Sequence, residues 1–340
     1  MIDINSLKDM HYNIALTYKC NLNCQHCYNV KTNESMSKEV LAKANEFICN
    51  HINSHDIPTS EIEFIGGEVG IFDQNLIQST IKYIKDHTKG KNVTFLYQTN
   101  LVYELTDLHK EVIELVDAVG TSYDYNIRLR NMRERILWFN NMKYLRSIDK
   151  KVKLVITKTN QLIKNVTPAM LLDFLVAMDI HILILNSCMI TNELNKLLAP
   201  KGEEVREWTY NLFLLYEKIK EHYNLRINEI ENTIDSFYGN KEFIHARICS
   251  LDNITIQPNG DITTCVMNSD KVVNNLITGK HNYTLEEVFN IERTLNQRCI
   301  DCKYFCYCNG GCHNYPIDET GCVVPYKIYD YLKAKELINE

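Results

Sequence analysis

The sequence predicts an α/β protein built around a parallel sheet. Its 340 residues are enough for one large α/β domain and a smaller one, and 45% hydrophobic with 24% charged residues is ordinary for a globular chain. In the first half, short β-rich runs alternate with longer segments of helical spacing. This alternation favours right-handed βαβ crossovers, because parallel strands need a long connection between them.

The elements follow one another in a regular order. The expected strands are Tyr12–Thr17, Glu61–Ile65, Val93–Gln98, Ala118–Ser122, Val152–Thr157 and His181–Leu185. The expected helices between them are Lys38–Ile52, Asn75–Asp86, Asp107–Val116, Met132–Leu145 and Pro168–Met178. A long helix over Glu203–Tyr223 then leaves the repeat. From Cys249 the chain changes to short strands and turns, with a hairpin within Ile254–Cys265 and a closing helix over 326–339.

We therefore expect a core domain over residues 1–200, a helical connection over 201–242, a cysteine-rich domain over 243–325 and a terminal helix over 326–340. The N-terminus lacks the basic and apolar segments of a signal peptide, and no apolar run approaches the ~18 residues of a membrane span. A net charge of −6 gives no general attraction to nucleic acid or to an anionic membrane. We expect a cytoplasmic protein that binds neither.

The thirteen cysteines form two dense groups. Three lie within residues 20–27, eight lie between residues 249 and 322, and only Cys49 and Cys188 stand apart. The cytosol keeps thiols reduced, so a disulfide framework is not expected there. Dense groups in a large chain of ordinary composition indicate metal binding instead.

The first group is Cys20-Asn-Leu-Asn-Cys24-Gln-His-Cys27, just after the first expected strand. A [4Fe–4S] cluster normally takes four thiolates, one per iron. No fourth cysteine comes before Cys49, so one iron would lack a protein ligand. Such an iron can chelate a small molecule and pass it an electron. The alternative is zinc, or an ordinary iron–sulfur site with a distant fourth ligand.

Gly66-Gly67-Glu68 follows the second expected strand. Glycines there permit close approach of a ligand to the backbone, although a simple strand-to-helix turn is the alternative. Together with the cysteine triplet, this turn resembles the motifs of the radical S-adenosylmethionine (SAM) enzymes. The resemblance implies that SAM chelates the open iron and is cleaved reductively to a 5′-deoxyadenosyl radical, which abstracts a hydrogen from the substrate. Gly66, Gly67 and Glu68 would bind the SAM amine.

The same resemblance implies further contacts to SAM. Ser122 and Asp124 match positions near its ribose and carboxylate, and Tyr28 follows the third cysteine. The family's residue before that cysteine, here His26, helps to position the adenine; a hydrogen bond to sulfur is the alternative.

Two arginines follow the fourth expected strand. Arg128 or Arg130 could pair with a carboxylate, or both could belong to a solvated helix start.

The second cysteine group has a regular spacing. Cys249 is followed by ten residues, Gly260, four residues and Cys265, and then come Cys299-x2-Cys302-x5-Cys308-x3-Cys312 and Cys322. Cys299-x2-Cys302 alone would suit zinc. The full pattern resembles the SPASM extension of radical SAM enzymes, which carries two auxiliary [4Fe–4S] clusters. The resemblance implies an outer cluster on Cys299, Cys302, Cys308 and Cys322. It implies an inner cluster on Cys249, Cys265 and Cys312, with an open iron or another ligand.

Three cysteines fall outside these patterns. Cys188 follows the sixth expected strand and is a candidate catalytic residue, as a hydrogen donor, a substrate-linked thiol or a ligand; a small buried hydrophobe is the alternative. Cys306 lies outside the seven-cysteine spacing. Cys49 sits in an expected helix and should belong to the core.

The resemblance covers residues 12–186 and 243–325. It implies a partial (β/α)6 TIM-like barrel with a C-terminal cysteine-rich extension, three clusters in all, and SAM as cosubstrate. It further implies an oxidoreductase that modifies a peptide or protein, served by a reductant such as flavodoxin or ferredoxin. About eleven residues precede the first strand, so a separate peptide-recognition protein is a further expected partner. A radical SAM enzyme for a small molecule or carbohydrate, and a non-catalytic electron carrier, are the alternatives.

Overall fold

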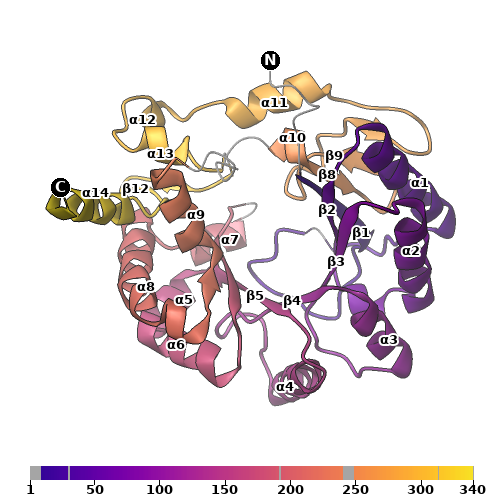
Figure 1. Ribbon diagram of the computed structural model, residues 1–340, viewed down its shortest axis with the longest axis horizontal. Coiled ribbons are helices and arrows are strands. Elements are labelled where there is room, and N and C mark those ends of the chain that lie inside the picture. Colours follow the sequence, from indigo (N-terminus) through magenta and orange to yellow (C-terminus); the bar gives the residue numbers. More distant parts are fainter. Residues whose placement is uncertain (1–8, 30, 191–192, 240–248, 313, 340) are drawn as a thin grey trace.

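A single curled sheet with helices on its outer side forms the body of the protein (Figure 1). The computed structural model describes residues 9–29, 31–190, 193–239, 249–312 and 314–339. Ten strands pair in the order β10-β9-β8-β1-β2-β3-β4-β5-β6-β7, and the strands from β1 to β7 are parallel. Each of β1 to β6 lies beside the next in sequence, which is the winding of a partial barrel. The predicted fold class is confirmed.

The strands of this sheet are β1 (Asp9–Thr17), β2 (Thr59–Gly66), β3 (Asn92–Thr99), β4 (Ala118–Ser122), β5 (Val152–Lys158), β6 (Ile182–Ser187), β7 (Arg226–Ile227), β8 (Asn253–Ile256), β9 (Asp261–Thr263) and β10 (Asn274–Asn275). A separate hairpin consists of β11 (Ile317–Asp318) and β12 (Gly321–Cys322).

The longer helices are α1 (Lys38–Ser54), α2 (Gln74–His87), α3 (Asp107–Leu115), α4 (Met132–Ser147), α6 (Pro168–Ala177), α8 (Gly202–Tyr223), α9 (Asn228–Phe237), α11 (Leu285–Arg293) and α14 (Lys327–Asn339). The shorter ones are α5 (Asn160–Asn165), α7 (Glu193–Leu198), α10 (Cys249–Asp252), α12 (Gln297–Ile300), α13 (Phe305–Cys308) and the 3-10 turn η2 (Val69–Ile71). None of the helices in the described ranges is long and apolar enough to span a membrane.

Polar side chains cap the N-termini of the helices that connect one strand to the next. Each accepts a hydrogen bond from a backbone N–H of the first turn, which would otherwise lack a partner. These caps are Ser37, Asp73, Thr106, Asn131, Thr159 and Thr167. The apolar helix faces then pack on the outer side of the sheet, where Ile48, Ile81 and Trp138 are fully buried. Cys49 is also buried in this core, as predicted.

The six predicted strands and five predicted helices form within three residues of their expected bounds, as do the long helix α8 and the closing helix α14. The sequence did not predict α5, α7 or α9, and after Cys249, where it predicted short strands and turns, the structure also contains α10, α11, α12 and α13. The first two are too short for a periodic signal. No side-chain cap marks the start of α9.

The predicted hairpin forms as β8 and β9, and it extends the main sheet. β8 pairs in parallel with β1 from His11↔Asn253 to Ile14↔Ile256. Asn13 on β1 is 7% exposed, and its Nδ2 donates to Asn253 Oδ1 at 2.7 Å and to Thr255 Oγ1 at 3.3 Å. A buried amide needs such partners, so β8 completes this edge of β1. The predicted domain boundaries stay a prediction.

The concave side of the sheet carries charged groups. Lys153 Nζ on β5 lies 2.6 Å from Glu61 Oε2 on β2, and His11 Nδ1 on β1 lies 3.9 Å from Glu61 Oε1. β2 and β5 are separated by two strands in the sheet, so the Glu61–Lys153 pair crosses the concave side. The interior of the curled sheet is therefore polar.

Candidate functional site

The first cysteine group lies in the loop that follows β1. Cys20, Cys24 and Cys27 are all partly buried. Burial raises the pKa of the Cys20 and Cys24 thiols, and the charge of the next cysteine along the loop raises each pKa further. The three thiols therefore share one neighbourhood at the carboxyl end of the strand, which is where a barrel places its site.

The turn Gly66-Gly67-Glu68 packs directly on the segment before Cys20. The backbone N–H of Gly67 donates to Thr17 O at 2.6 Å, and that of Glu68 donates to Lys19 O at 2.8 Å. A Cβ atom at Gly66 would lie 2.2 Å from Thr17 O, and one at Gly67 would lie 2.1 Å from Lys19 O. The backbone of the cysteine loop itself therefore requires both glycines.

Glu68 ties the end of β3 to the same loop. Its carboxylate is 1% exposed and accepts hydrogen bonds from Gly70 N at 2.7 Å, Thr99 Oγ1 at 2.5 Å and Asn100 N at 2.7 Å. Burial raises the pKa of Glu68, and these three bonds oppose the rise. Asn100 Nδ2 donates to Asn21 Oδ1 at 2.7 Å and lies 3.9 Å from Cys20 Sγ. Three of the roughly four acceptor positions of a carboxylate are thus filled by protein.

Asp124, just after β4, fixes the residue before the third cysteine. It is 4% exposed; its Oδ2 lies 3.0 Å from His26 Nε2 and 2.8 Å from Arg128 Nε, and its Oδ1 accepts from Thr157 N at 2.7 Å. Burial would raise the pKa of Asp124, but Arg128 and His26 outweigh burial and hold the pKa well below its usual range. His26 Nδ1 is buried and has no hydrogen-bond partner within the described residues, so it can accept or donate to a ligand.

Both arginines after β4 contact this site. Arg128 pairs with Asp124 through Nε, and its positive charge partly opposes the rise that burial causes in the pKa of the Cys24 thiol. Arg130 donates a hydrogen bond from Nη2 to Asn23 O in the cysteine loop. α4 begins only at Met132, so both arginines precede the helix. Of the two interpretations given by the sequence, pairing with a carboxylate is the one that Arg128 follows.

Three other predicted site residues have different surroundings. Ser122 is the last residue of β4 and is buried. Tyr28 is 39% exposed, and the charges of both Cys27 and Cys265 act on its hydroxyl. Cys188 is 2% exposed, its Sγ donates to Asn195 O at 3.8 Å, and burial with the nearby charge of Asp124 raises its pKa to about 11. Such an environment favours the neutral thiol, and the catalytic role of Cys188 stays a prediction.

The second cysteine group separates into two neighbourhoods. We call Cys299, Cys302, Cys308 and Cys322 the outer group. Burial, together with the charges of the other three members, raises the pKa of the Cys308 thiol to about 11. Burial likewise raises the pKa of Cys265 to about 11, and the cysteine that acts on it is Cys312. The structure thus brings together the four outer cysteines and two of the three inner ones.

The side chain of Cys249 lies outside the described residues, so its predicted place in the inner group is not tested. Cys306 is exposed, and its Sγ donates to Lys303 O at 3.8 Å.

No three His, Cys, Asp or Glu side chains in the described part of the chain are arranged to hold a single metal ion. The grouped thiols are the ligand type of iron–sulfur clusters, and the four partly buried thiols of the outer group are enough ligands for one cubane.

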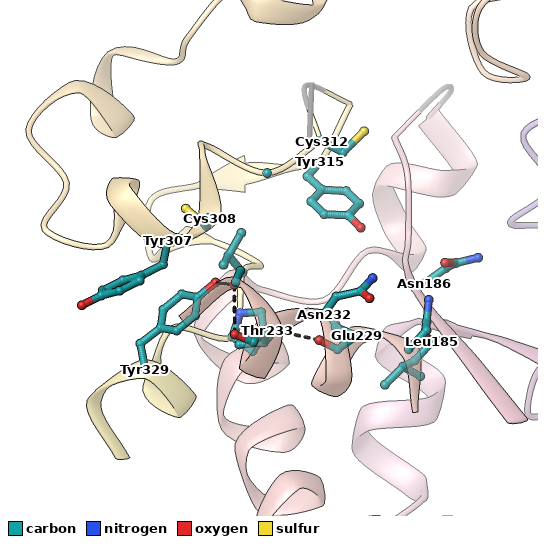
Figure 2. Close-up of a pocket in the computed structure, with 15 residues that line it drawn as sticks. Leu185, Asn186, Glu229, Asn232, Thr233, Tyr307, Cys308, Cys312, Tyr315 and Tyr329 are labelled. Atoms are coloured by element: carbon teal, nitrogen blue, oxygen red, sulfur yellow. Dashed lines mark hydrogen bonds between the residues drawn. The ribbon is translucent and has the colours of Figure 1, made fainter. Parts of the chain in front are cut away.

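A pocket of about 240 Å³ lies between the end of β6, α9 and the cysteine-rich segment (Figure 2). Asn186, Glu229 and Asn232 lie on one side of it, and Cys312 and Tyr315 lie on the other. The Glu229 carboxylate accepts two hydrogen bonds from Lys158 Nζ, at 2.5 and 2.6 Å, and Lys158 is fully buried. The pocket is therefore lined by the amides of Asn186 and Asn232, the phenol of Tyr315 and the Glu229 carboxylate, which is paired with the Lys158 ammonium group.

The sequence did not single out Glu229 and Asn232 as site residues. Both lie on α9, the helix that the sequence pattern did not predict. Thr157 and Lys158 were visible as polar residues at a strand end, but nothing in the sequence linked Lys158 to a partner 71 residues away.

Glu63, on the concave side of β2, gives a pH-dependent prediction. Burial and the charge of Glu61 raise its pKa from 4.5 to about 7, against the opposing effect of Lys153. A carboxyl whose pKa is higher in the folded chain than in the unfolded chain destabilises the fold as the pH rises from the lower pKa value through the higher one. The reason is that ionisation is easier in the unfolded chain. We expect Glu63→Gln to raise the free energy of unfolding at pH 8 by on the order of 1–3 kcal/mol. The gain should shrink as the pH falls toward 5.

Urea unfolding of the two proteins at pH 5 and pH 8 measures this effect. The matched control is Glu61→Gln on the same strand, which should lower stability at pH 8 because it leaves Lys153 without its partner. A Glu63→Gln variant that is less stable than wild type at pH 8 would refute the prediction.

One known family matches part of the first half of the chain. Residues 13–144 match the family Fer4_12, described as a 4Fe-4S single cluster domain. This segment runs from β1 into α4 and contains the first cysteine group, Gly66–Glu68 and Asp124. A match of 115 residues at 31% identity relates 34% of this chain to the uncharacterized protein MJ0907 of Methanocaldococcus jannaschii. It covers 38% of that protein's length.

Solved structures match almost the whole chain. Native anSMEcpe with bound AdoMet gives a TM-score of 0.73 at 16% identity, over 97% of this chain and 98% of that one. Native anSMEcpe with AdoMet and the Kp18Cys peptide gives 0.74 at 16% identity, with the same coverage. Streptococcus suis SuiB bound to the precursor peptide SuiA gives 0.60 at 14% identity, over 91% of this chain and 73% of that one. The predicted resemblance to radical SAM enzymes with a SPASM extension is confirmed in its fold.

Proposed function

We propose that this protein is a radical SAM enzyme that modifies a peptide or protein. The observation that carries the proposal is the way the cysteine loop is held. Three partly buried thiols follow β1, and the ends of β2, β3 and β4 fix their loop through Gly67, Asn100 and Asp124. A site with three thiolates and a rigid frame fits a cluster that leaves one iron for another ligand.

The proposed cofactors follow from these residues. Cys20, Cys24 and Cys27 would hold a [4Fe–4S] cluster whose open iron binds SAM. When bound and reduced, this cluster would supply one electron for cleavage of the SAM sulfonium bond, which releases methionine and a 5′-deoxyadenosyl radical; the radical becomes 5′-deoxyadenosine by taking a hydrogen from the substrate. Gly66, Gly67, Glu68, Ser122, Asp124 and Tyr28 are proposed to surround SAM.

Charged and polar groups of the chain prepare this site. The positive charge of Arg128 partly opposes the rise that burial causes in the pKa of the Cys24 thiol, and to that extent it favours the thiolate form that binds iron. Asp124 fixes His26 through Nε2, which leaves the buried His26 Nδ1 for SAM or for a cluster sulfur.

Two auxiliary clusters are proposed for the second cysteine group, which would make three clusters in all. The outer group would hold one of them, and Cys249, Cys265 and Cys312 would hold the other. The polar pocket is lined by Cys312 and by residues at the end of β6, so it is a proposed binding place for part of the substrate. We propose the core domain as residues 1–200 and the auxiliary-cluster domain as residues 243–325.

A peptide substrate is supported by the structures of similar fold. One anSMEcpe structure contains the Kp18Cys peptide, and the SuiB structure contains its precursor peptide SuiA. We propose a flavodoxin or ferredoxin as reductant and a separate recognition protein as a further partner. A small-molecule or carbohydrate substrate is the alternative that the experiments below distinguish.

Anaerobic reconstitution tests the cofactors. We expect about twelve irons per chain. Dithionite and SAM together should then yield 5′-deoxyadenosine, which liquid chromatography with mass spectrometry detects. A protein that binds about four irons and does not cleave SAM would contradict the proposal.

The substrate is tested by co-expression with short peptides encoded beside this protein. Mass spectrometry should show the loss of two hydrogens for a cross-link or a thioether, and incorporation of deuterium from D₂O for an epimerisation. The matched control carries Cys24→Ala and should leave each peptide unchanged. Modification of a sugar or small metabolite, with every peptide unchanged, would favour the alternative.

A further inference from the structure

Arg206, on the first turns of α8, is a buried cation beside the outer cysteine group. α8 lies beside the hairpin that carries Cys322 (Figure 1). Arg206 is 4% exposed, donates from Nη1 to Cys322 O, and donates from Nη2 to Thr320 O at 2.7 Å. The guanidinium also stacks on the Tyr326 ring, 4.8 Å from its centroid. It is thus held firmly in place.

Glycines leave the room that this guanidinium occupies. A Cβ at Gly321 would meet Arg206 Nη1 first, at 3.2 Å, whereas one at Gly202 would meet Gly321 O at 2.5 Å before Arg206 Nη1 at 3.1 Å. Gly321 also has a φ of +110°, which other residues adopt at a cost. The local backbone is therefore shaped around Arg206.

No carboxylate in the described part of the chain forms an ion pair with Arg206. Its hydrogen-bond acceptors are carbonyl oxygens, and its Nε is buried without a partner among the described residues. The positive charge of Arg206 contributes to lowering the pKa of Asp318. The Asp318 oxygens, however, accept their hydrogen bonds from other groups: Gly202 N at 2.8 Å, Thr320 N at 2.8 Å and Thr320 Oγ1 at 2.6 Å. A buried charge is normally balanced by an opposite charge nearby, and no carboxylate among the described residues is bonded to Arg206, so an anion beside the guanidinium would be favourable.

The proposed outer cluster supplies that anion, since an oxidised cubane held by four thiolates carries a net negative charge. Resting on the proposed function, we infer that Arg206 is the buried counter-ion of the outer cluster and raises its reduction potential. Reduction adds a further negative charge to the cluster. A fixed cation in a site of low dielectric stabilises the reduced form more than the oxidised form.

The test is a redox titration of the full, anaerobically reconstituted protein, followed by electron paramagnetic resonance. The signal that disappears in Cys308→Ala belongs to the outer cluster. At a fixed potential, Arg206→Met should lower the reduced-to-oxidised ratio of this signal about tenfold, which is a midpoint about 59 mV more negative for a one-electron couple. Arg206→Lys should keep a midpoint near that of wild type.

Lys201→Met is the matched control. Lys201 directly precedes α8 and pairs with Glu319 Oε1 at 3.4 Å, but it is exposed to solvent. Lys201→Met removes one positive charge, as Arg206→Met does. Because water screens the charge of exposed Lys201, the midpoint potential of the outer cluster should stay unchanged.

Each outcome decides the inference. An intact outer cluster with an unmoved midpoint in Arg206→Met would refute it and leave the proposed function standing. If Arg206→Met loses the outer cluster, retention in Arg206→Lys supports the counter-ion, and loss in both variants shows that the hydrogen bonds matter and refutes it. If Cys308→Ala removes no iron from the reconstituted protein, the cluster assignment fails, and the inference fails with it.

Discussion

Cys24→Ala is expected to abolish the formation of 5′-deoxyadenosine while leaving the auxiliary clusters in place. Cys24 is the central member of the three-thiol loop, and its removal leaves two ligands where three hold the proposed cluster. Even groups that only support a metal ligand change activity by about 10–100-fold, so loss of a ligand should exceed about 100-fold. Iron should fall from about twelve to about eight per chain.

Cys306→Ala is the matched control for this experiment. Cys306 is exposed and lies outside the spacing of both groups, so its replacement should keep the iron content and the rate of SAM cleavage. A Cys24→Ala protein that retains twelve irons, or that cleaves SAM at the wild-type rate, would rule out the three-thiolate site.

Gly67→Ala is expected to have the second large effect, without touching any cysteine. The added Cβ would lie 2.1 Å from Lys19 O, and this contact is to backbone, which cannot rotate away. The segment before Cys20 must therefore shift. Overpacking of this kind costs about 3 kcal/mol at its upper range, and a shift of about 1 Å in a reacting group costs about 100-fold in rate. Urea unfolding and the 5′-deoxyadenosine assay measure the two effects.

The control for this variant is Gly90→Ala, in the turn after α2. A Cβ there would meet nothing within 4 Å, although its φ of +89° strains the backbone of any residue other than glycine. Gly90→Ala should therefore cleave SAM at the wild-type rate. If Gly67→Ala folds with full stability and full activity, the close packing of the two loops does not matter for the site.

The sequence predicted the repeating part of the fold because its signals are local. Each strand from β1 to β6 is a short apolar run, and each return helix has its own periodicity and its own polar cap, such as Ser37 or Asp73. The spacing of Cys20, Cys24 and Cys27, and the position of Gly66–Glu68 after the next strand, are local in the same sense. Patterns of this kind need no knowledge of distant contacts.

Contacts between distant segments could not be predicted in this way. Glu68 was expected to face SAM, and the structure shows that Gly70, Thr99 and Asn100 fill most of its acceptor positions. The pairing of Lys158 with Glu229, and of Arg206 with the backbone of Cys322, joins segments 71 and 116 residues apart. A single sequence carries no sign of such pairs, because each member alone resembles an ordinary surface residue.

The pairing of β8 with β1 determines when this protein can finish folding. Asn13 and Asn253 are 240 residues apart, and the strand that precedes the first cysteine group has an open edge until β8 arrives. During synthesis, most of the chain must leave the ribosome before that edge is covered. An uncovered edge strand invites pairing with other chains, and contacts of such long range form slowly. The edge of β1 therefore stays uncovered until about three-quarters of the chain, through β8, has been made.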